Sequence, residues 1–87
     1  MIFQKNPTNY LETEIDNESV LMNLGSGKFN ALKGTGLAVW QAIDGIRDLA
    51  EIKALMANTY KVSPAVCAAE VDSFVSELKE AGFIVAV

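Results

Sequence analysis

The feature that most constrains the fold is the segment Ser19–Gly45, in which the spacing of apolar residues changes from that of strands to that of a helix. It begins with the apolar run Val20–Met22, and a turn at Gly25–Gly27 separates this run from a second one, Phe29–Leu32. Two strand-like runs joined by a few residues that include glycine are typical of a β-hairpin. From Gly36 onward the apolar spacing is helical, so the hairpin is predicted to lead directly into a helix.

A further strand is predicted before the hairpin, over Tyr10–Asp16. Its residues alternate between an apolar set expected to face inward (Leu11, Thr13, Ile15) and an acidic set expected to face outward (Glu12, Glu14, Asp16). This pattern indicates a half-buried strand with an acidic outer face. The next strand, Ser19–Leu24, is expected to be central, with little solvent on either face. The third, Lys28–Leu32, is short and flanked by glycines, so we expect it at a sheet edge. Met1–Asn9 is predicted as a lead-in with a turn at Asn6–Pro7.

Three helices are predicted after the sheet. The first runs from Thr35 or Gly36 to Ile43, with Thr35 as its N-cap and a glycine, Gly45, beyond its end. The second begins after Asp48, which forms a capping-box pair with Glu51. Their apolar residues are Leu37, Ala38, Trp40, Ala42 and Ile43 in the first helix, and Leu49, Ile52, Leu55, Met56 and Tyr60 in the second.

The third helix is predicted to open at Ser63–Pro64, with serine as the cap and proline at the first helical position. Its apolar stripe consists of Cys67, Val71, Phe74, Val75 and Leu78, and Ala81–Gly82 ends it. The remaining Phe83–Val87 is either a final short strand or a tail laid on the core. The predicted fold class is therefore α+β and winged-helix-like, with a three-stranded antiparallel sheet followed by three helices in one domain, residues 1–87.

The composition narrows the classes of function. The 87 residues include one cysteine and no histidine, so the chain has no intrachain disulfide and lacks the commonest catalytic base. Cys67 lies on an apolar stripe and is interpreted as a small buried hydrophobe. No apolar run approaches the roughly 20 residues that span a bilayer. We expect a cytoplasmic protein that is not an enzyme and has no cofactor, metal or membrane partner.

Nearly the whole chain resembles a known family. The residues that carry the resemblance are Leu21-Met22-Asn23-Leu24, Gly27-Lys28-Phe29, Leu32, Gly36, Trp40 and Asp44-Gly45, continued by Leu49, Ile52, Leu55, Val71, Phe74, Leu78, Gly82 and Phe83. In this order and spacing they resemble the PqqD-like proteins, also called RiPP precursor-peptide recognition elements, over Ile15 to Val85. The short format is similar to the small proteins that serve lasso-peptide leader peptidases, and PqqD itself, which assists a radical-SAM enzyme, is nearly as similar.

The resemblance implies a non-enzymatic adaptor that binds the leader segment of a ribosomally made precursor peptide. The leader would pair as an added strand along Lys28–Leu32, lie against the helix face drawn from Val66–Leu78, and be presented to a peptidase or a radical-SAM maturase. The implied peptide-binding residues are Lys28, Phe29, Asn30, Ala31, Leu32, Val71, Phe74, Val75 and Leu78.

Several residues have two interpretations at this stage. Each apolar residue of the third helix belongs either to the core or to the cleft, and Trp40 is interpreted as a core anchor. Lys28 and Lys33 either pair with leader carboxylates or discourage edge-to-edge aggregation. The acidic residues Glu12, Glu14, Glu70, Asp72, Glu77 and Glu80 are either solvated or attract lysine and arginine of a leader or an enzyme.

Three other functions are alternatives to the adaptor. A DNA-binding winged helix is disfavoured because Pro64–Gly82 carries four acidic residues and one basic residue, whereas phosphate contact needs positive charge. An acyl or peptidyl carrier is disfavoured because Ser73 falls in mid-helix and the first third of the chain is predicted as strands. A general protein–protein interaction module with some other partner stays open.

Overall fold

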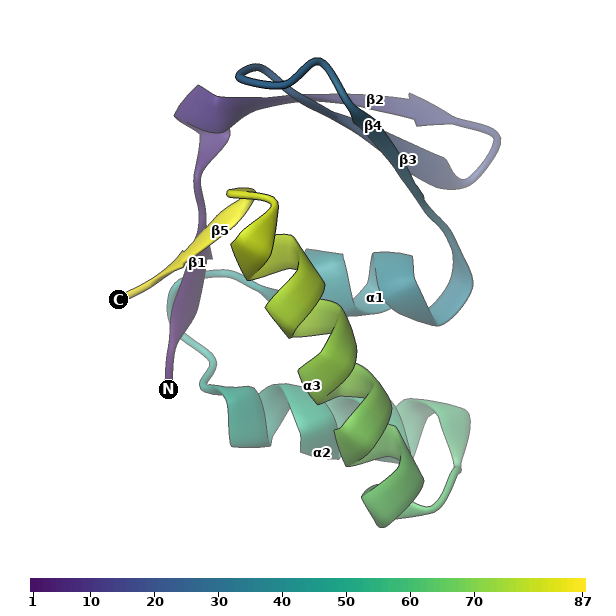
Figure 1. Ribbon diagram of the computed structural model, residues 1–87. Helices are drawn as coiled ribbons and strands as arrows, with labels where there is room; N and C mark the ends of the chain where they lie inside the picture. The colour runs from purple at the N-terminus through teal and green to yellow at the C-terminus, as the bar shows by residue number, and fades with distance from the viewer.

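The computed structural model describes all residues from Met1 to Val87. The elements are β1 (Phe3–Lys5), the 3-10 helix η1 (Pro7–Asn9), β2 (Tyr10–Ile15), β3 (Glu18–Asn23), β4 (Phe29–Leu32), α1 (Gly34–Ala42), α2 (Leu49–Tyr60), α3 (Pro64–Glu80) and β5 (Ile84–Ala86). The predicted α+β fold is confirmed, because β2, β3 and β4 form an antiparallel sheet in that order and three helices follow. The sheet lies above α1 and the C-terminal end of α3, and α2 lies farthest from it (Figure 1).

A second, two-stranded sheet joins the two ends of the chain. Strands β1 and β5 pair antiparallel, with Phe3 opposite Ala86 and Lys5 opposite Ile84. The prediction of a lead-in over Met1–Asn9 missed β1, since a three-residue strand is too short to show a period. Of the two alternatives for Phe83–Val87, the final short strand is confirmed. The N- and C-termini consequently lie close together (Figure 1).

The orientation predicted for β2 is wrong. Glu12 is paired with Leu21, which is fully buried, so the face that carries Glu12 and Glu14 is the one turned toward the helices. Leu11 and Ile15 are 55% and 56% exposed on the opposite face. This outer face also carries Leu11, Met22 and Phe29 in one row across the three strands, and no helix covers it (Figure 1).

Tyr10 explains this orientation. Its ring is buried and packs edge-on against Trp40 at 5.3 Å and against Phe83 at 5.9 Å between ring centroids. A buried aromatic ring contributes more apolar area than a partly covered leucine. Glu12 reaches the same cluster, because Trp40 Nε1 donates a hydrogen bond to Glu12 Oε2 at 3.2 Å. Burial and the nearby Glu12 carboxylate raise the pKa of Tyr10 above its usual value.

The helix ends follow the predictions only in part. The capping box of α2 is confirmed, since the Asp48 side chain accepts from the Glu51 N–H at 2.8 Å and Glu51 accepts from the Asp48 N–H at 3.3 Å. Pro64 is confirmed at the start of α3, but neither Thr35 nor Ser63 caps a helix with its side chain, and Lys33 occupies the N-cap position of α1. No helix has the length and apolar content needed to cross a membrane.

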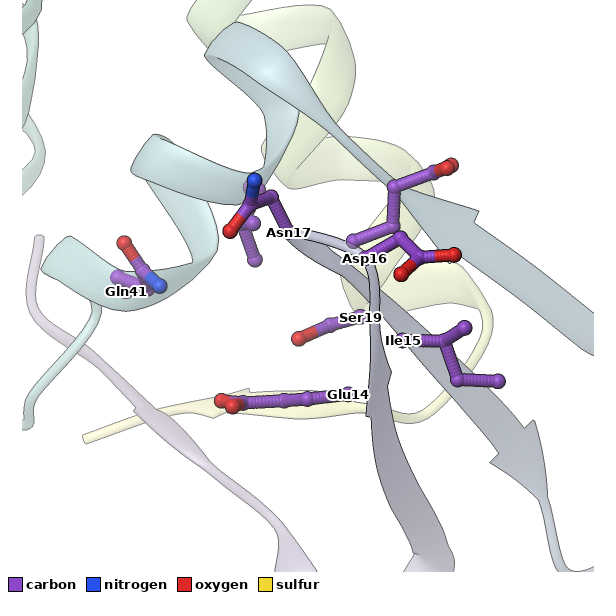
Figure 2. A pocket seen from close by; sticks show the side chains of 8 residues that line it. Glu14, Ile15, Asp16, Asn17, Ser19 and Gln41 are labelled. Carbon is purple, nitrogen blue, oxygen red and sulfur yellow. The ribbon is translucent and has the colours of Figure 1, made fainter.

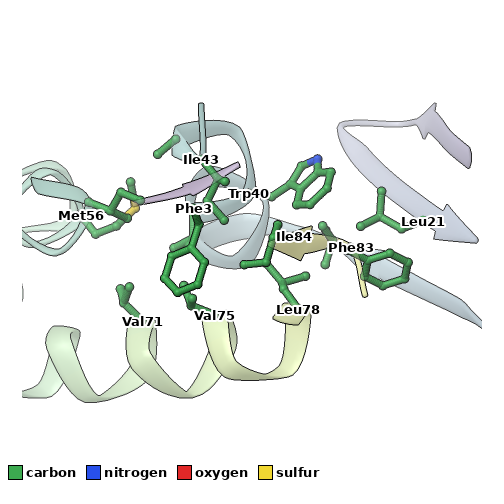
Figure 3. Packing of buried hydrophobic residues seen from close by; sticks show 14 of the residues in the cluster. Phe3, Leu21, Trp40, Ile43, Met56, Val71, Val75, Leu78, Phe83 and Ile84 are labelled. Carbon is green, nitrogen blue, oxygen red and sulfur yellow. The ribbon is translucent and has the colours of Figure 1, made fainter. Parts of the chain in front are cut away.

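The core is one cluster of sixteen buried residues drawn from both sheets and all three helices. Its largest fully buried side chain is Trp40, and Phe83 follows. The prediction of Trp40 as a core anchor is confirmed, and so is that of Cys67 as a buried hydrophobe. Figure 3 shows Val71, Val75 and Leu78 projecting from one side of α3 toward Phe3 and Ile84.

Gly82 follows the end of α3 and contacts Asn9, the residue that precedes β2. Replacing Gly82 tests how much this contact contributes to stability. Gly82 has a φ of +81°, and an added Cβ would lie 2.5 Å from Asn9 Nδ2. That nitrogen donates to the Gly82 carbonyl at 2.9 Å, so it cannot move away without losing the bond. We expect Gly82→Ala to lower the free energy of unfolding by about 2–3 kcal/mol, combining left-handed strain with the lost hydrogen bond.

Gly27→Ala is the matched control, because Gly27 also has a left-handed φ, +73°, but an added Cβ meets nothing within 4 Å. We expect it to cost only about 1–2 kcal/mol in urea denaturation. Equal losses for the two variants would show that the Asn9 contact contributes nothing to stability.

Candidate functional site

The sheet has two unpaired edges, along β2 and along β4, and the edge of β4 is the one that borders a groove. Because β4 is the last strand in the order β2-β3-β4, it pairs on one side only. The Asn23 N–H donates to the Lys28 carbonyl at 2.8 Å, so Lys28 turns its backbone toward β3. In an antiparallel ladder, successive residues alternately direct their N–H and C=O groups toward the partner strand and away from it. Phe29 and Ala31 therefore direct their N–H and C=O groups away from β3, toward the open edge.

The side chains of β4 alternate as well. Asn30 and Leu32 lie opposite the buried Leu21 and Ser19, which places them on the helix-facing side of the sheet. Phe29, 68% exposed, lies on the outer face. An added strand would continue this alternation, so every second side chain would point toward α3.

A groove separates β4 from α3, and we call it the β4–α3 groove. Its apolar section is a hollow of about 260 Å³ lined by Phe29, Asn30, Ala31, Leu32, Phe74, Glu77 and Leu78. Leu32 and Leu78 are buried and form its floor, while Phe74 is half-buried. Small-molecule pockets usually span about 300–1,000 Å³, so this section suits one or two side chains of a peptide better than a small ligand.

The groove continues into a polar section of about 460 Å³. This hollow is lined by Asn23, Ser26, Lys28, Asn30, Glu77, Glu80, Ala81 and Phe83. Asn30 and Glu77 line both sections, so the two adjoin. The Asn23 side chain shapes the far end, where Nδ2 donates to the Ala81 carbonyl and Oδ1 accepts from the Gly25 and Ser26 N–H groups.

Most of the residues predicted for peptide binding lie at this groove. Phe29, Asn30, Ala31, Leu32, Phe74 and Leu78 line the apolar section, and Lys28 lines the polar one. Val71 and Val75 do not: they are 2% and 3% exposed and pack in the core (Figure 3). The helical period explains the difference, since the side of α3 that carries Phe74 and Glu77 is rotated away from the side that carries Val71 and Val75.

Glu77 and Glu80 are the charged groove residues that the predicted peptide-binding set did not include. They formed part of a larger acidic set with two open interpretations, because acidic residues on a long helix carry no local sign of what they face. Both side chains are exposed, and neither takes part in an ion pair, since the two ion pairs of the molecule join Arg47 to Asp44 and Lys53 to Asp72.

The other hollows offer less chemistry. One lies between the β2–β3 turn and α1, lined by Glu14, Ile15, Asp16, Asn17, Glu18, Ser19, Leu37 and Gln41, and Figure 2 shows its polar side chains at the turn and on α1. Another lies between α2 and α3 and is lined largely by alanines. No group of three or more carboxylate or cysteine side chains is arranged to hold a metal ion.

The fold and the open edge together define a small α+β domain of the PqqD-like class. A family model described as coenzyme PQQ synthesis protein D (PqqD) matches residues 18–84. The chain therefore belongs to the PqqD family, and the resemblance found in the sequence is confirmed. Comparison with curated proteins finds no match.

Two solved structures share the fold. One, described as TbiB1 in complex with the TbiA(beta) leader peptide, is 19% identical with a TM-score of 0.82, covering 97% of this chain and 96% of that one. The other, lasso peptide synthetase B1 complexed with the leader peptide, is 21% identical with a TM-score of 0.83, covering 99% of this chain and 100% of that one. At this identity the likeness establishes the fold of nearly the entire chain.

Proposed function

We propose that this protein is a non-catalytic adaptor that binds the leader segment of a ribosomally synthesised precursor peptide. The leader adds as a strand to β4 and is delivered to a processing enzyme, either a leader peptidase or a radical-SAM or other maturase. The observation that carries the proposal is the unpaired edge of β4 beside an apolar groove in a PqqD-family fold. Both similar structures are described as complexes with leader peptides, which supports the same role here.

The edge and the groove would contribute differently to the binding of an extended peptide. Phe29 and Ala31 offer four backbone groups, and hydrogen bonds to them contribute about 1 kcal/mol net each. Ordering an extended peptide costs a comparable amount, so main-chain bonds alone give weak binding. Apolar side chains that enter the groove add about 25 cal/mol for each Å² they bury. Backbone pairing thus supplies the geometry, and the groove supplies affinity and selectivity.

The available side chains support a non-catalytic role. The chain has no histidine, and its one cysteine, Cys67, is 4% exposed in the core with Sγ 3.9 Å from the Lys53 carbonyl oxygen. A nucleophilic cysteine needs access and an activating base. The exposed acidic residues of α3, including Glu70 and Glu77, likewise disfavour contact with DNA phosphates.

Ala31→Pro tests the strand addition directly. The Ala31 N–H points to the open edge, so proline removes a donor used by the peptide while the internal ladder keeps its bonds. We expect binding of a synthetic leader, taken from the nearest precursor gene, to weaken at least tenfold in a fluorescence anisotropy titration. Ala31→Thr, which keeps the N–H and suits a strand, is the control and should bind like the native protein.

Backbone amide NMR during the same titration locates the contact. We expect chemical-shift changes concentrated in residues 27–33 and in the part of α3 that lines the groove. Unchanged affinity in a folded Ala31→Pro variant, or shifts confined to other surfaces, would contradict the proposal. Adding the candidate processing enzyme to the native protein and leader should give a ternary complex by size-exclusion chromatography.

A further inference from the structure

The β4–α3 groove changes character along its length. Near Leu32 its lining is mostly apolar, with Phe74 and Leu78 on the helix side and Glu77 at the boundary with the polar section. In the polar section the helix side carries Glu77 and Glu80, and only Ala81 and Phe83 of the lining residues are apolar. A peptide that runs along β4 would therefore meet an apolar surface at one point and carboxylates at the next.

The carboxylate end of the groove favours a cation for two independent reasons. Glu77 and Glu80 have no ion-pair partner within the molecule, and Lys28, which lines the same section, pairs with neither. Both glutamates also lie in the last turn of α3, which ends at Glu80. The C-terminal end of a helix carries a partial negative charge that attracts cations.

The strand register sets the spacing between the two peptide residues that would face the apolar and the polar section. Asn30 and Leu32 are the helix-facing residues of β4, two positions apart. Asn30 and Leu32 alternate with Phe29 and Ala31, whose N–H and C=O groups would bond to an added strand. In an antiparallel arrangement, Asn30 and Leu32 would therefore face the peptide in non-hydrogen-bonded pairs, in which opposite side chains approach most closely. Two peptide residues spaced by one intervening residue, roughly 7 Å apart, would thus face the apolar and the acidic sections.

Resting on the proposed function, we infer that the bound peptide carries an apolar residue and, two positions away, a lysine or arginine. The apolar side chain fills the section formed by Leu32, Phe74 and Leu78, and the cation is bound by Glu77 and Glu80. In antiparallel pairing the apolar residue comes first, giving apolar-x-basic. In parallel pairing the order is reversed. Glu77 and Glu80 are therefore specificity-determining residues of the groove.

Designed peptides test this inference. The probes are labelled twelve-residue threonine- and valine-rich strands whose centre is Leu-Thr-Lys, Lys-Thr-Leu, Leu-Thr-Gln or Leu-Thr-Glu, titrated at low salt up to millimolar concentration. We expect one lysine peptide to bind about threefold to fivefold more tightly than Leu-Thr-Gln, and Leu-Thr-Glu to bind more weakly than either. Which lysine peptide prevails reports the direction of the added strand. The preference should diminish in high salt.

Three protein variants complete the design. The double variant Glu77→Gln/Glu80→Gln should abolish the lysine preference, and Glu77→Lys should make Leu-Thr-Glu the tighter ligand. Glu70→Gln removes an exposed carboxylate of the same helix that lines neither section, so it should leave the preference unchanged. Thermal unfolding of each variant would show whether the fold is retained.

The outcomes separate this inference from the proposed function. Equal binding of the lysine and glutamine peptides, with both weakened by Ala31→Pro, would overturn the inference while strand addition stands. A lysine preference that survives the double glutamine variant would also overturn it. Absence of binding by any peptide would contradict strand addition itself and the inference with it.

Discussion

Replacement of Trp40 by alanine is expected to lower the free energy of unfolding by about 3–5 kcal/mol, the usual range for removing a large aromatic side chain from a core. Trp40 is 1% exposed and is the largest fully buried side chain. It also packs against the Tyr10 ring, donates to Glu12, and has Lys5 Nζ 4.7 Å from its ring centroid. The substitution would open a cavity where α1 meets the sheet.

Urea denaturation measures this loss. Tyr60→Ala serves as the aromatic control, since Tyr60 is 42% exposed at the end of α2 and should cost far less. Trp40→Phe should fall between the two, because it keeps most of the ring volume but loses the hydrogen bond to Glu12. A loss for Trp40→Ala no greater than that for Tyr60→Ala would contradict the burial of Trp40 between α1 and the sheet.

Replacement of Phe74 by alanine is expected to weaken leader binding about 10- to 30-fold, the effect of losing an aromatic anchor at an interface. Phe74 is half-buried and lines the apolar section of the β4–α3 groove. Its ring edge also lies near Gly36, where an added Cβ would be 3.5 Å away. Because part of the ring already faces solvent, we expect a smaller loss of stability than for Trp40→Ala.

A titration with the synthetic leader would measure the loss, with thermal unfolding recorded in parallel. Val66→Ala is the matched control on the same helix, because Val66 is 56% exposed in the first turn of α3 and lines neither section of the groove. Phe74→Ala should unfold at a lower temperature than Val66→Ala, because Phe74 packs against the core, but both should be folded under the conditions of the titration and differ in affinity. Native affinity in Phe74→Ala would exclude the apolar section as the main binding surface.

Local patterns predicted the features whose physical causes are local. The capping box of Asp48 and Glu51 depends on residues three positions apart, and Pro64 begins α3 because proline suits the first helical turn. The edge position of β4 followed from its shortness and its glycines. The predicted caps were less accurate: Thr35 lies inside the first turn of α1, and Ser63 occupies the N-cap position of α3 but makes no side-chain hydrogen bond there.

The helix face of the groove was predictable only as a set of candidates. The sequence placed Val71, Phe74, Val75 and Leu78 on one apolar stripe. A stripe wide enough to cover both the core and the groove does not show which of its residues face the core and which face the groove. The position of β4 decided it, so that Val71 and Val75 entered the core and Phe74 turned toward the groove. Glu77 entered the site for the same reason.

The sequence by itself determined the order of strands and helices, the hairpin that presents β4, and the family. The element order and the hairpin depend on hydrogen bonding and hydrophobic period within a few residues, whereas the family was indicated by the resemblance. Only the tertiary structure decided the facing of β2, the pairing of β1 with β5, and the side of α3 that meets β4. Each of these depends on contacts between distant segments: Tyr10 is buried against Trp40 and Phe83, and that packing outweighs the alternation of Leu11 and Glu12 along the strand.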